Sequence, residues 1–270
     1  MYPVDIYCFS GTGNTLLVAR AMRDRFVERG IDAAVRRLEA CDPGEVDLSH
    51  VTGIACPVAA QSTYPLVWDF VRGLPASDGS GAFLVDTLAA FSGGIVGPMR
   101  RVLAGKGYAP LGASEVRMPS NFLRRRADAA GDARRIVAGV EAARGYADAL
   151  AEGKARWRGM RPWEPVFRLG EVFSYGRLKL LGRLVRFSVD ETKCVACGLC
   201  ERLCPMGAIS RSGARGFPEF SPACIACMRC FSYCPTGAIK IRGKDYVRHR
   251  PVEAADLLGQ DAGGGAGTGG

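Results

Sequence analysis

Eight of the 11 cysteines of this 270-residue chain lie between Cys194 and Cys234 and form a repeat. The spacing Cys-x-x-Cys-x-x-Cys-x-x-x-Cys-Pro that begins at Cys194 returns thirty residues later at Cys224. The likeness continues past the cysteines, because Gly-Ala-Ile at 207–209 matches Gly-Ala-Ile at 237–239. An echo of this length indicates an internal duplication. The segment is therefore predicted to fold as two related halves with four thiols each.

This spacing is the one in which three cysteines of a tight loop bind one iron–sulfur cluster and the fourth, before proline, binds the other. It predicts a first 4Fe-4S site at Cys194, Cys197, Cys200 and Cys234. It predicts a second 4Fe-4S site at Cys224, Cys227, Cys230 and Cys204. The alternative is a pair of zinc sites, because thiolates also select zinc. The doubled Cys-Pro spacing favours clusters.

These residues closely resemble bacterial-type two-cluster ferredoxins, and the resemblance covers residues 188–242. It implies a small α+β ferredoxin-like domain. Such a module has too small an apolar core to be secure alone, so we expect the metal–thiolate bonds to hold its fold. Many small ferredoxins of this type are acidic, whereas basic residues outnumber acidic ones here. The resemblance therefore leaves the partner open.

Residues 1–153 alternate short apolar runs with longer amphipathic ones, which is the pattern of a parallel sheet with crossover helices. Strands are predicted at residues 5–9, 33–38, 53–57, 82–88 and 113–118. Helices are predicted at residues 14–29, 66–73, 95–105 and 127–152. The predicted fold class is an α/β doubly wound five-stranded parallel sheet. Ligand-binding loops are expected beyond the carboxyl ends of the strands, at a switch point in strand order.

The turn between the first predicted strand and the first helix is rich in small and hydroxyl residues. It reads Ser10, Gly11, Thr12, Gly13, Asn14 and Thr15. Backbone N–H groups, hydroxyls and the positive end of a helix dipole are what a phosphate group requires. A dinucleotide fingerprint would need glycine where Leu16 stands, and a Walker loop would need Gly-Lys-Ser/Thr. A helix cap that binds nothing is the remaining alternative.

The turn resembles the phosphate loop of flavodoxins, in which Ser/Thr-x-Thr-Gly-x-Thr binds the terminal phosphate of FMN. Ser10, Thr12, Gly13 and Thr15 match this pattern. The resemblance implies a flavodoxin-like FMN-binding domain over residues 1–153, with the flavin ring between the loops after the third and fourth strands. Those loops supply Pro57, Val58, Tyr64, Phe91, Ser92, Gly93 and Gly94. The two aromatic residues are candidates to stack on the ring and residues 92–94 to offer it N–H groups, although an aromatic residue in such a loop also serves as packing.

Residues 154–187 are predicted to be a structured linker with nine basic residues against Glu164 and Glu171. Leu178, Leu181 and Val185 recur at helical spacing and predict a short amphipathic helix. The aromatic residues of the linker either clamp the two domains or, with the cations, attach the chain to an anionic membrane surface or an acidic partner. Residues 243–270 are predicted to be a tail, disordered from Gly259 onward because the sequence becomes glycine-rich.

Several patterns restrict the location and the chemistry. No secretory signal and no apolar run of membrane-spanning length is visible, which together with thiol-rich sites favours a cytoplasmic location. The net charge of +9 favours acidic partners, but no nucleic-acid-reading module is recognised. Only two histidines, His50 and His249, are present, which leaves little room for imidazole catalysis. Cys8 and Cys56 fall in apolar strands, and with Cys41 they are assigned no role.

The order of the two segments resembles the prokaryotic family of flavodoxin–ferredoxin fusion proteins, and Met118-Pro119-Ser120-Asn121 also suits that family. The resemblance implies one FMN and two 4Fe-4S clusters in one chain. Because FMN takes one or two electrons and each cluster passes one, we expect an electron-transfer protein that converts between these steps. Its partner would be a redox protein or a small electron acceptor. The alternative is a flavin-dependent reductase with a small-molecule substrate, for which no catalytic residue is assigned.

Overall fold

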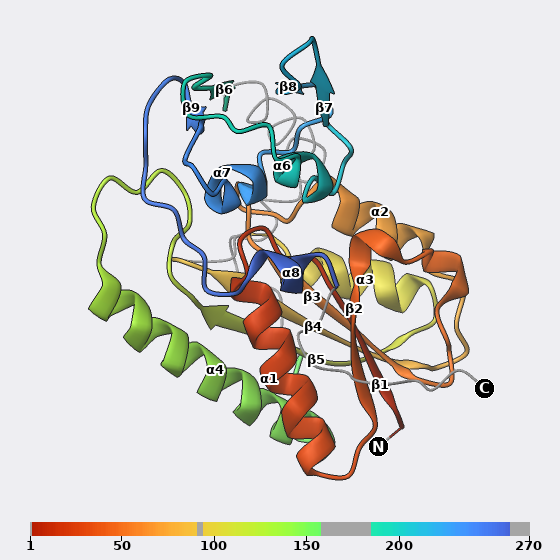
Figure 1. Cartoon of the computed structure of the whole chain (residues 1–270). Helices are drawn as coiled ribbons and strands as arrows, with labels where there is room; N and C mark the ends of the chain where they lie inside the picture. The colour runs from red at the N-terminus through yellow and green to blue at the C-terminus, as the bar shows by residue number, and fades with distance from the viewer. Residues whose placement is uncertain (1, 91–93, 158–184, 260–270) are drawn as a thin grey trace, which may run out of the picture.

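The N-terminal domain is built on one parallel sheet of five strands in the order β2-β1-β3-β4-β5 (Figure 1). The computed structural model describes residues 2–90, 94–157 and 185–259. The strands are β1 (Val4–Cys8), β2 (Ala33–Arg37), β3 (Val51–Pro57), β4 (Gly81–Leu88) and β5 (Ala109–Arg117). All five predicted strands are present, with boundaries moved by up to four residues. This order is that of flavodoxin-like doubly wound sheets, and the switch point lies between β1 and β3.

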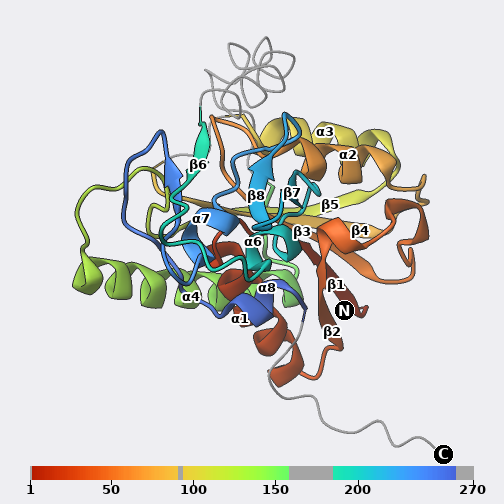
Figure 2. The ribbon, with the colours of Figure 1, turned by 45° about the horizontal axis from the view of Figure 1, so that its top comes forward.

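Two layers of helices cover the sheet, as Figure 2 shows most clearly. On one face lie α1 (Asn14–Glu28) and α4 (Ala129–Ala151), and on the other lie α2 (Pro65–Gly73) and α3 (Val96–Gly105). Each face has its own apolar core: Met22 and Phe26 of α1 belong to the first, and Trp68 of α2 belongs to the second. The four helices were predicted at these positions because their apolar residues recur at helical spacing.

The connection from β2 to β3 contains two short 3-10 turns where the other crossovers carry α-helices. These turns are η1 (Leu38–Ala40) and η2 (Pro43–Glu45). The second has proline at its first position and is capped by Asp42, whose carboxylate accepts a hydrogen bond from the Gly44 N–H at 2.8 Å. The short connection brings Glu39 to the carboxyl end of β2, where the second domain packs.

The C-terminal domain consists of two short antiparallel ladders and two short helices. One ladder pairs β6 (Phe187–Val189) with β9 (Ile239–Ile241), and the other pairs β7 (Ile209–Ser212) with β8 (Phe217–Phe220). The helices α6 (Leu199–Arg202) and α7 (Arg229–Tyr233) begin thirty residues apart. Left-handed backbone occurs at matching positions, at Ala196 and Gly198 in one half and at Ala226 and Met228 in the other. The sequence duplication is thus a structural duplication.

Residues 247–258, which we call the C-terminal strap, return to the N-terminal domain and end in α8 (Ala254–Leu257). Both views place α8 beside the start of α1 (Figures 1 and 2). Leu257 is 3% exposed and belongs to the core between α1 and α4, and the Arg37 guanidinium donates to the Leu258 carbonyl at 2.7 Å. The segment predicted as a tail therefore includes a packed element as far as this point.

Two predictions concern residues that the structure leaves undescribed. The amphipathic helix expected in the linker falls almost wholly within residues 158–184, and the glycine-rich end falls within residues 260–270; both ranges lie outside the described residues. Among the residues that are described, no helix is both long and apolar enough to cross a membrane.

Candidate functional site

The first candidate site forms around the turn that joins β1 to α1. Gly13 precedes the helix with φ 112, a left-handed conformation that favours glycine, and no side chain caps the first turn of α1. The Gly13 N–H donates to the Ser10 hydroxyl oxygen at 3.0 Å, which closes the turn. The uncapped N–H groups of the first helical turn therefore remain available to an anion, on the side that the helix dipole makes positive.

A cavity of about 140 Å³ lies beside this turn. Eight of the predicted cofactor-binding residues line it: Ser10, Gly11, Thr12, Asn14, Thr15, Pro57, Val58 and Tyr64. Gly13 does not, because its α-carbon faces the strap; an added Cβ would lie 2.6 Å from Val252 Cγ2. The loop between β5 and α4 adds further residues to the lining, chief among them Ser120 and Phe122. The sequence singled out Ser120 only as part of a family feature and did not single out Phe122.

The hydroxyl groups of the cavity are arranged as donors. The Ser10 oxygen accepts from the Gly13 N–H, and the Thr12 Oγ1 atom accepts from Asn121 Nδ2 at 2.8 Å. Because these oxygens serve as acceptors, their own hydrogens stay free to donate. No charged side chain stands among the residues that line the cavity. The described part of the wall offers N–H and O–H donors without a cation, which suits a phosphate cradle of this kind.

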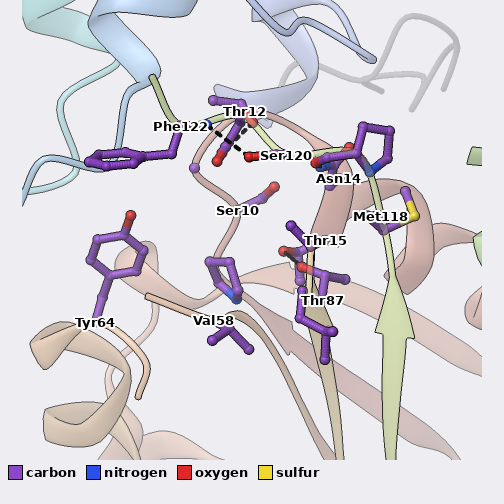
Figure 3. Close-up of a pocket in the computed structure, with 16 residues that line it drawn as sticks. Ser10, Thr12, Asn14, Thr15, Val58, Tyr64, Thr87, Met118, Ser120 and Phe122 are labelled. Atoms are coloured by element: carbon purple, nitrogen blue, oxygen red, sulfur yellow. Dashed lines mark hydrogen bonds between the residues drawn. The ribbon is translucent and has the colours of Figure 1, made fainter. Parts of the chain in front are cut away.

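The other end of the cavity is aromatic. Tyr64 packs edge to face against Phe9 with ring centroids 5.3 Å apart, and burial raises the pKa of its hydroxyl. In Figure 3, Phe122 lies across from Tyr64, while Ser10, Thr15 and Thr87 stand on the opposite side. Thr15 and Thr87 share a hydroxyl–hydroxyl hydrogen bond of 2.7 Å.

The loop after β4 is described only in part. Phe91, Ser92 and Gly93, predicted to face a flavin ring, lie outside the described residues. Gly94 is described; its N–H donates to the Gln61 carbonyl at 2.9 Å and so ties this loop to the loop after β3. Gly94 is not among the residues that line the cavity.

The eight cysteines of the repeat gather into the two predicted groups of four. We call Cys194, Cys197, Cys200 and Cys234 the outer set and Cys204, Cys224, Cys227 and Cys230 the inner set. Each set lines its own hollow, together with apolar side chains such as Val195 and Ile239 for the outer set and Ile209 and Phe187 for the inner set. Within the described part of the chain, no three metal-binding side chains converge on the position of a single metal ion. Four thiols around an apolar hollow suit a 4Fe-4S cluster, and the ligand assignment stays a prediction.

Backbone N–H groups point at several of these sulfurs. Ala208 N–H donates to Cys204 Sγ at 3.2 Å and Ala226 N–H to Cys224 Sγ at 3.4 Å. Burial alone would raise the pKa of Cys234, but hydrogen bonds led by the Ile239 N–H lower it. Hydrogen bonds to sulfur favour the thiolate and also tune the reduction potential of any cluster that these thiolates bind.

The two sets differ in their surroundings. Cys197 of the outer set is exposed, whereas Cys227 and Cys230 of the inner set are buried. The turn at residues 10–15, which we call the phosphate loop after its predicted role, covers the inner set: a Cβ added to Gly11 would lie 2.6 Å from the Cys227 carbonyl oxygen. The inner set and the N-terminal cavity therefore share a wall, whereas the outer set contains the one exposed cysteine of the eight.

Arg229, between two cysteines of the inner set, is a buried cation that the sequence alone did not single out. Its side chain is 3% exposed and pairs with Glu39, 6% exposed, at 2.7 Å. Its Nε donates to the Ser10 carbonyl at 2.9 Å, and its guanidinium carbon lies 5.2 Å from the centre of the Phe9 ring. Burial raises the pKa of Cys227 to about 11, and the Arg229 charge acts in the opposite direction. Aligning the two halves of the repeat could have singled out Arg229, because the equivalent residue in the other half is the apolar Leu199.

The strap closes the other side of the phosphate loop. His249 Nε2 lies 2.7 Å from the Asn14 amide oxygen, and the Tyr233 hydroxyl lies 2.9 Å from the Thr12 carbonyl and 3.0 Å from the Val252 carbonyl. Burial lowers the pKa of His249. The nearby charge of Asp132 raises this pKa to a smaller extent, and that of Arg124 lowers it further. A neutral imidazole is therefore the form that fits this position.

The remaining cysteines line neither the cavity nor the hollows of the two cysteine sets. Burial raises the pKa of Cys8 and Cys56, and to a lesser extent that of Cys41. Thiols held in the protonated form have little nucleophilic character.

Comparison with known proteins identifies the second domain. Residues 187–241 match the family model described as a 4Fe-4S dicluster domain. No curated protein matches the chain. Among solved structures, a flavodoxin of Streptococcus pneumoniae TIGR4 is 17% identical, with 56% of this chain and 99% of that chain covered and a TM-score of 0.43. The two-electron reduced flavodoxin of Megasphaera elsdenii is 24% identical, with 53% of this chain and 98% of that chain covered and a TM-score of 0.39.

The chain thus joins a domain of flavodoxin topology to a 4Fe-4S dicluster domain. The first assignment rests on the strand order, and the second on the family model together with the eight-cysteine repeat. Domains of these two kinds support a role in electron transfer.

Proposed function

We propose that this protein relays electrons between two 4Fe-4S clusters and an FMN, and so converts between one-electron and two-electron steps. The observation that carries the proposal is the shared wall between Gly11 of the phosphate loop and Cys227 of the inner set. Two cofactor sites whose loops meet in a direct backbone contact are suited to exchange electrons within one chain.

The residues fit the groups that the proposal requires. The outer and inner sets would each hold one cluster through four thiolates. Ser10, Thr12 and Thr15, with the first-turn N–H groups of α1, would hold the FMN phosphate, and Tyr64 would lie along the flavin ring. When bound, FMN supplies two-electron capacity and each cluster supplies one-electron steps. The chain's own contribution is to fix these sites against each other and to keep water from the inner set.

The alternative of a flavin-dependent reductase gains less support from the cavity. Among the residues that line it, Tyr64 is the sole side chain with a titratable group, and its raised pKa keeps it protonated at neutral pH. A reductase that moves protons to a substrate needs a donor with a pKa nearer the working pH. The described walls therefore suit a carrier better than an acid–base catalyst.

The proposal is tested on the full chain purified without oxygen. About eight iron, eight sulfide and one FMN per chain are expected. After a single-turnover reduction of the clusters, flavin absorbance should bleach at a rate that does not depend on protein concentration, because the exchange is intramolecular. A rate proportional to concentration, or zinc in place of iron, would contradict the proposal.

A further inference from the structure

The two cysteine loops differ between their second and third cysteines. The outer loop carries Gly198-Leu199 and the inner loop carries Met228-Arg229. Leu199 packs as a partly buried apolar residue against the core between α1 and α4, whereas Arg229 is a cation 3% exposed. The duplicated fold therefore places a buried positive charge beside the inner set at a position where the outer set has an apolar residue.

Arg229 contacts each segment that separates the inner set from the phosphate loop. Its Nε donates to the Ser10 carbonyl at 2.9 Å, where the phosphate loop begins. A second guanidinium nitrogen donates to the Leu203 carbonyl at 3.4 Å, one residue before Cys204 of the inner set. The third pairs with Glu39 at 2.7 Å. The Arg229 side chain thus joins the two segments that carry the inner set, one with Cys204 and the other with Cys224, Cys227 and Cys230. It also contacts the phosphate loop and η1, and so fixes the spacing of these segments.

The charges around this pair do not cancel. Arg37 also lies 3.5 Å from the same Glu39 oxygen, and the other carboxylate oxygen has no hydrogen-bond partner among the described residues. Glu39 is shared between two guanidinium groups and neutralises each only in part. Arg37 is 34% exposed and screened by water, so the buried excess positive charge beside the inner set is that of Arg229. Coulomb interactions are strong at buried positions, so this charge favours an additional electron on whatever the inner set binds.

We propose that Arg229 is a positioning residue that holds the inner set against the phosphate loop and makes the inner centre easier to reduce than the outer one. An external one-electron donor would then deliver electrons at the exposed outer set. Each transfer oxidises the outer centre by one electron and reduces the inner centre by one electron, toward the cavity. The inference rests on the proposed function, because it requires clusters at both sets.

Three substitutions separate charge from packing. Arg229→Met removes the charge and keeps an apolar stem of similar length, Arg229→Lys keeps the charge, and Glu39→Gln removes the opposing charge while keeping a hydrogen-bond acceptor. Arg215→Met is the matched control, because Arg215 is an exposed cation of the same domain whose side chain is 77% exposed. A Cys197→Ser variant shows which measured potential belongs to the outer set.

The midpoint potentials of both centres are measured by redox titration followed by electron paramagnetic resonance, on full-length protein whose iron and sulfide have been counted. Arg229→Met should lower the inner potential by at least 59 mV, which is a tenfold change in the one-electron equilibrium. Glu39→Gln should raise it, and Arg229→Lys should restore it. The outer potential should stay unchanged in all three, and both potentials should stay unchanged in Arg215→Met.

An inner potential that does not move in Arg229→Met overturns the inference, and so does a shift in the same direction for Glu39→Gln. If Arg229→Met fails to fold, Glu39→Gln and Arg229→Lys decide the question by the same criteria. Wild-type protein without iron and sulfide would refute the proposed function and this inference together, whereas loaded clusters with unshifted potentials would refute this inference alone.

Discussion

Gly11→Ala tests whether the inner set and the phosphate loop are packed as closely as the structure has them. A Cβ at this position would lie 2.6 Å from the Cys227 carbonyl oxygen and 3.9 Å from Asn121 Nδ2. The first contact is with backbone, which has no rotamer that could move aside. To restore ordinary contact at 3.4 Å, the two segments would have to separate by about 0.8 Å.

The cost of this separation follows from overpacking. Forcing one extra carbon into a close-packed interface costs about 1–3 kcal/mol. For a chain of this size each kcal/mol lowers Tm by about 2–4 °C, so we expect a fall of about 2–12 °C. Because the shift widens the gap between the inner set and the cavity, the electron exchange between them should also slow.

The assay is thermal unfolding of wild type and variant with equal iron, sulfide and flavin content, since bound cofactors raise Tm on their own. Gly145→Ala is the matched control, because Gly145 lies in the interior of α4 and an added Cβ would meet nothing within 4 Å. That variant should be unchanged or more stable by up to about 1 kcal/mol, as alanine is the better helix former.

A Gly11→Ala variant as stable as wild type, with unchanged electron exchange, would refute the reasoning. It would mean that the phosphate loop and the Cys227 loop do not touch, and the shared wall on which the proposed function depends would be lost. Destabilisation of both glycine variants by the same amount would also contradict it, because Gly145 has no neighbour to clash with.

Three further outcomes are expected. Tyr233→Phe removes the hydroxyl that lies at 2.9 and 3.0 Å from the carbonyls of the phosphate loop and of the strap; chemical denaturation should show a loss of about 1–3 kcal/mol, and full stability would contradict the contact. Ser10→Ala should weaken FMN binding by about tenfold or more in fluorescence titrations and leave riboflavin, which has no phosphate, unaffected; equal losses would argue against a phosphate loop. The lowered pKa of His249 makes its contribution to stability complete above its ordinary pKa of 6.5 and lost as pH falls from there through the folded-state pKa; His249→Gln should reduce this pH dependence, and an unchanged pH profile would exclude the histidine as its cause.

Much of the N-terminal fold was predictable because the information is local. Strands such as β1 and β4 are short apolar runs, and α1 shows apolar residues at helical spacing after a glycine-rich turn. The turn at residues 10–15 was predicted as a phosphate site in the same way, and the structure places Ser10, Thr12 and Thr15 along a cavity. The β2–β3 connection offered no such periodicity, and it folds as two 3-10 turns fixed by Asp42 and Pro43.

The parts of the site that were missed come from long-range contacts. Phe122 lies in a loop without periodicity, and it lines the cavity only because β5 ends beside β4 in the sheet. The sequence predicts a tail where the strap lies, because residues 243–258 carry no strong pattern of their own. The strap is held by contacts with segments that are distant in the sequence. An example is the hydrogen bond between His249 and Asn14, which are 235 positions apart.

The sequence by itself predicted which residues hold metal and phosphate, because ligand spacing and turn composition are properties of neighbouring residues. Only the tertiary structure decided that Cys227 and Cys230 of the inner set are buried beside the cavity, whereas Cys197 of the outer set is exposed. That difference arises from burial of the Cys227 loop against the phosphate loop and from the Arg229–Glu39 pair. Both are contacts between segments that are distant in the sequence. Such contacts produce no periodic pattern of residues from which they could be predicted.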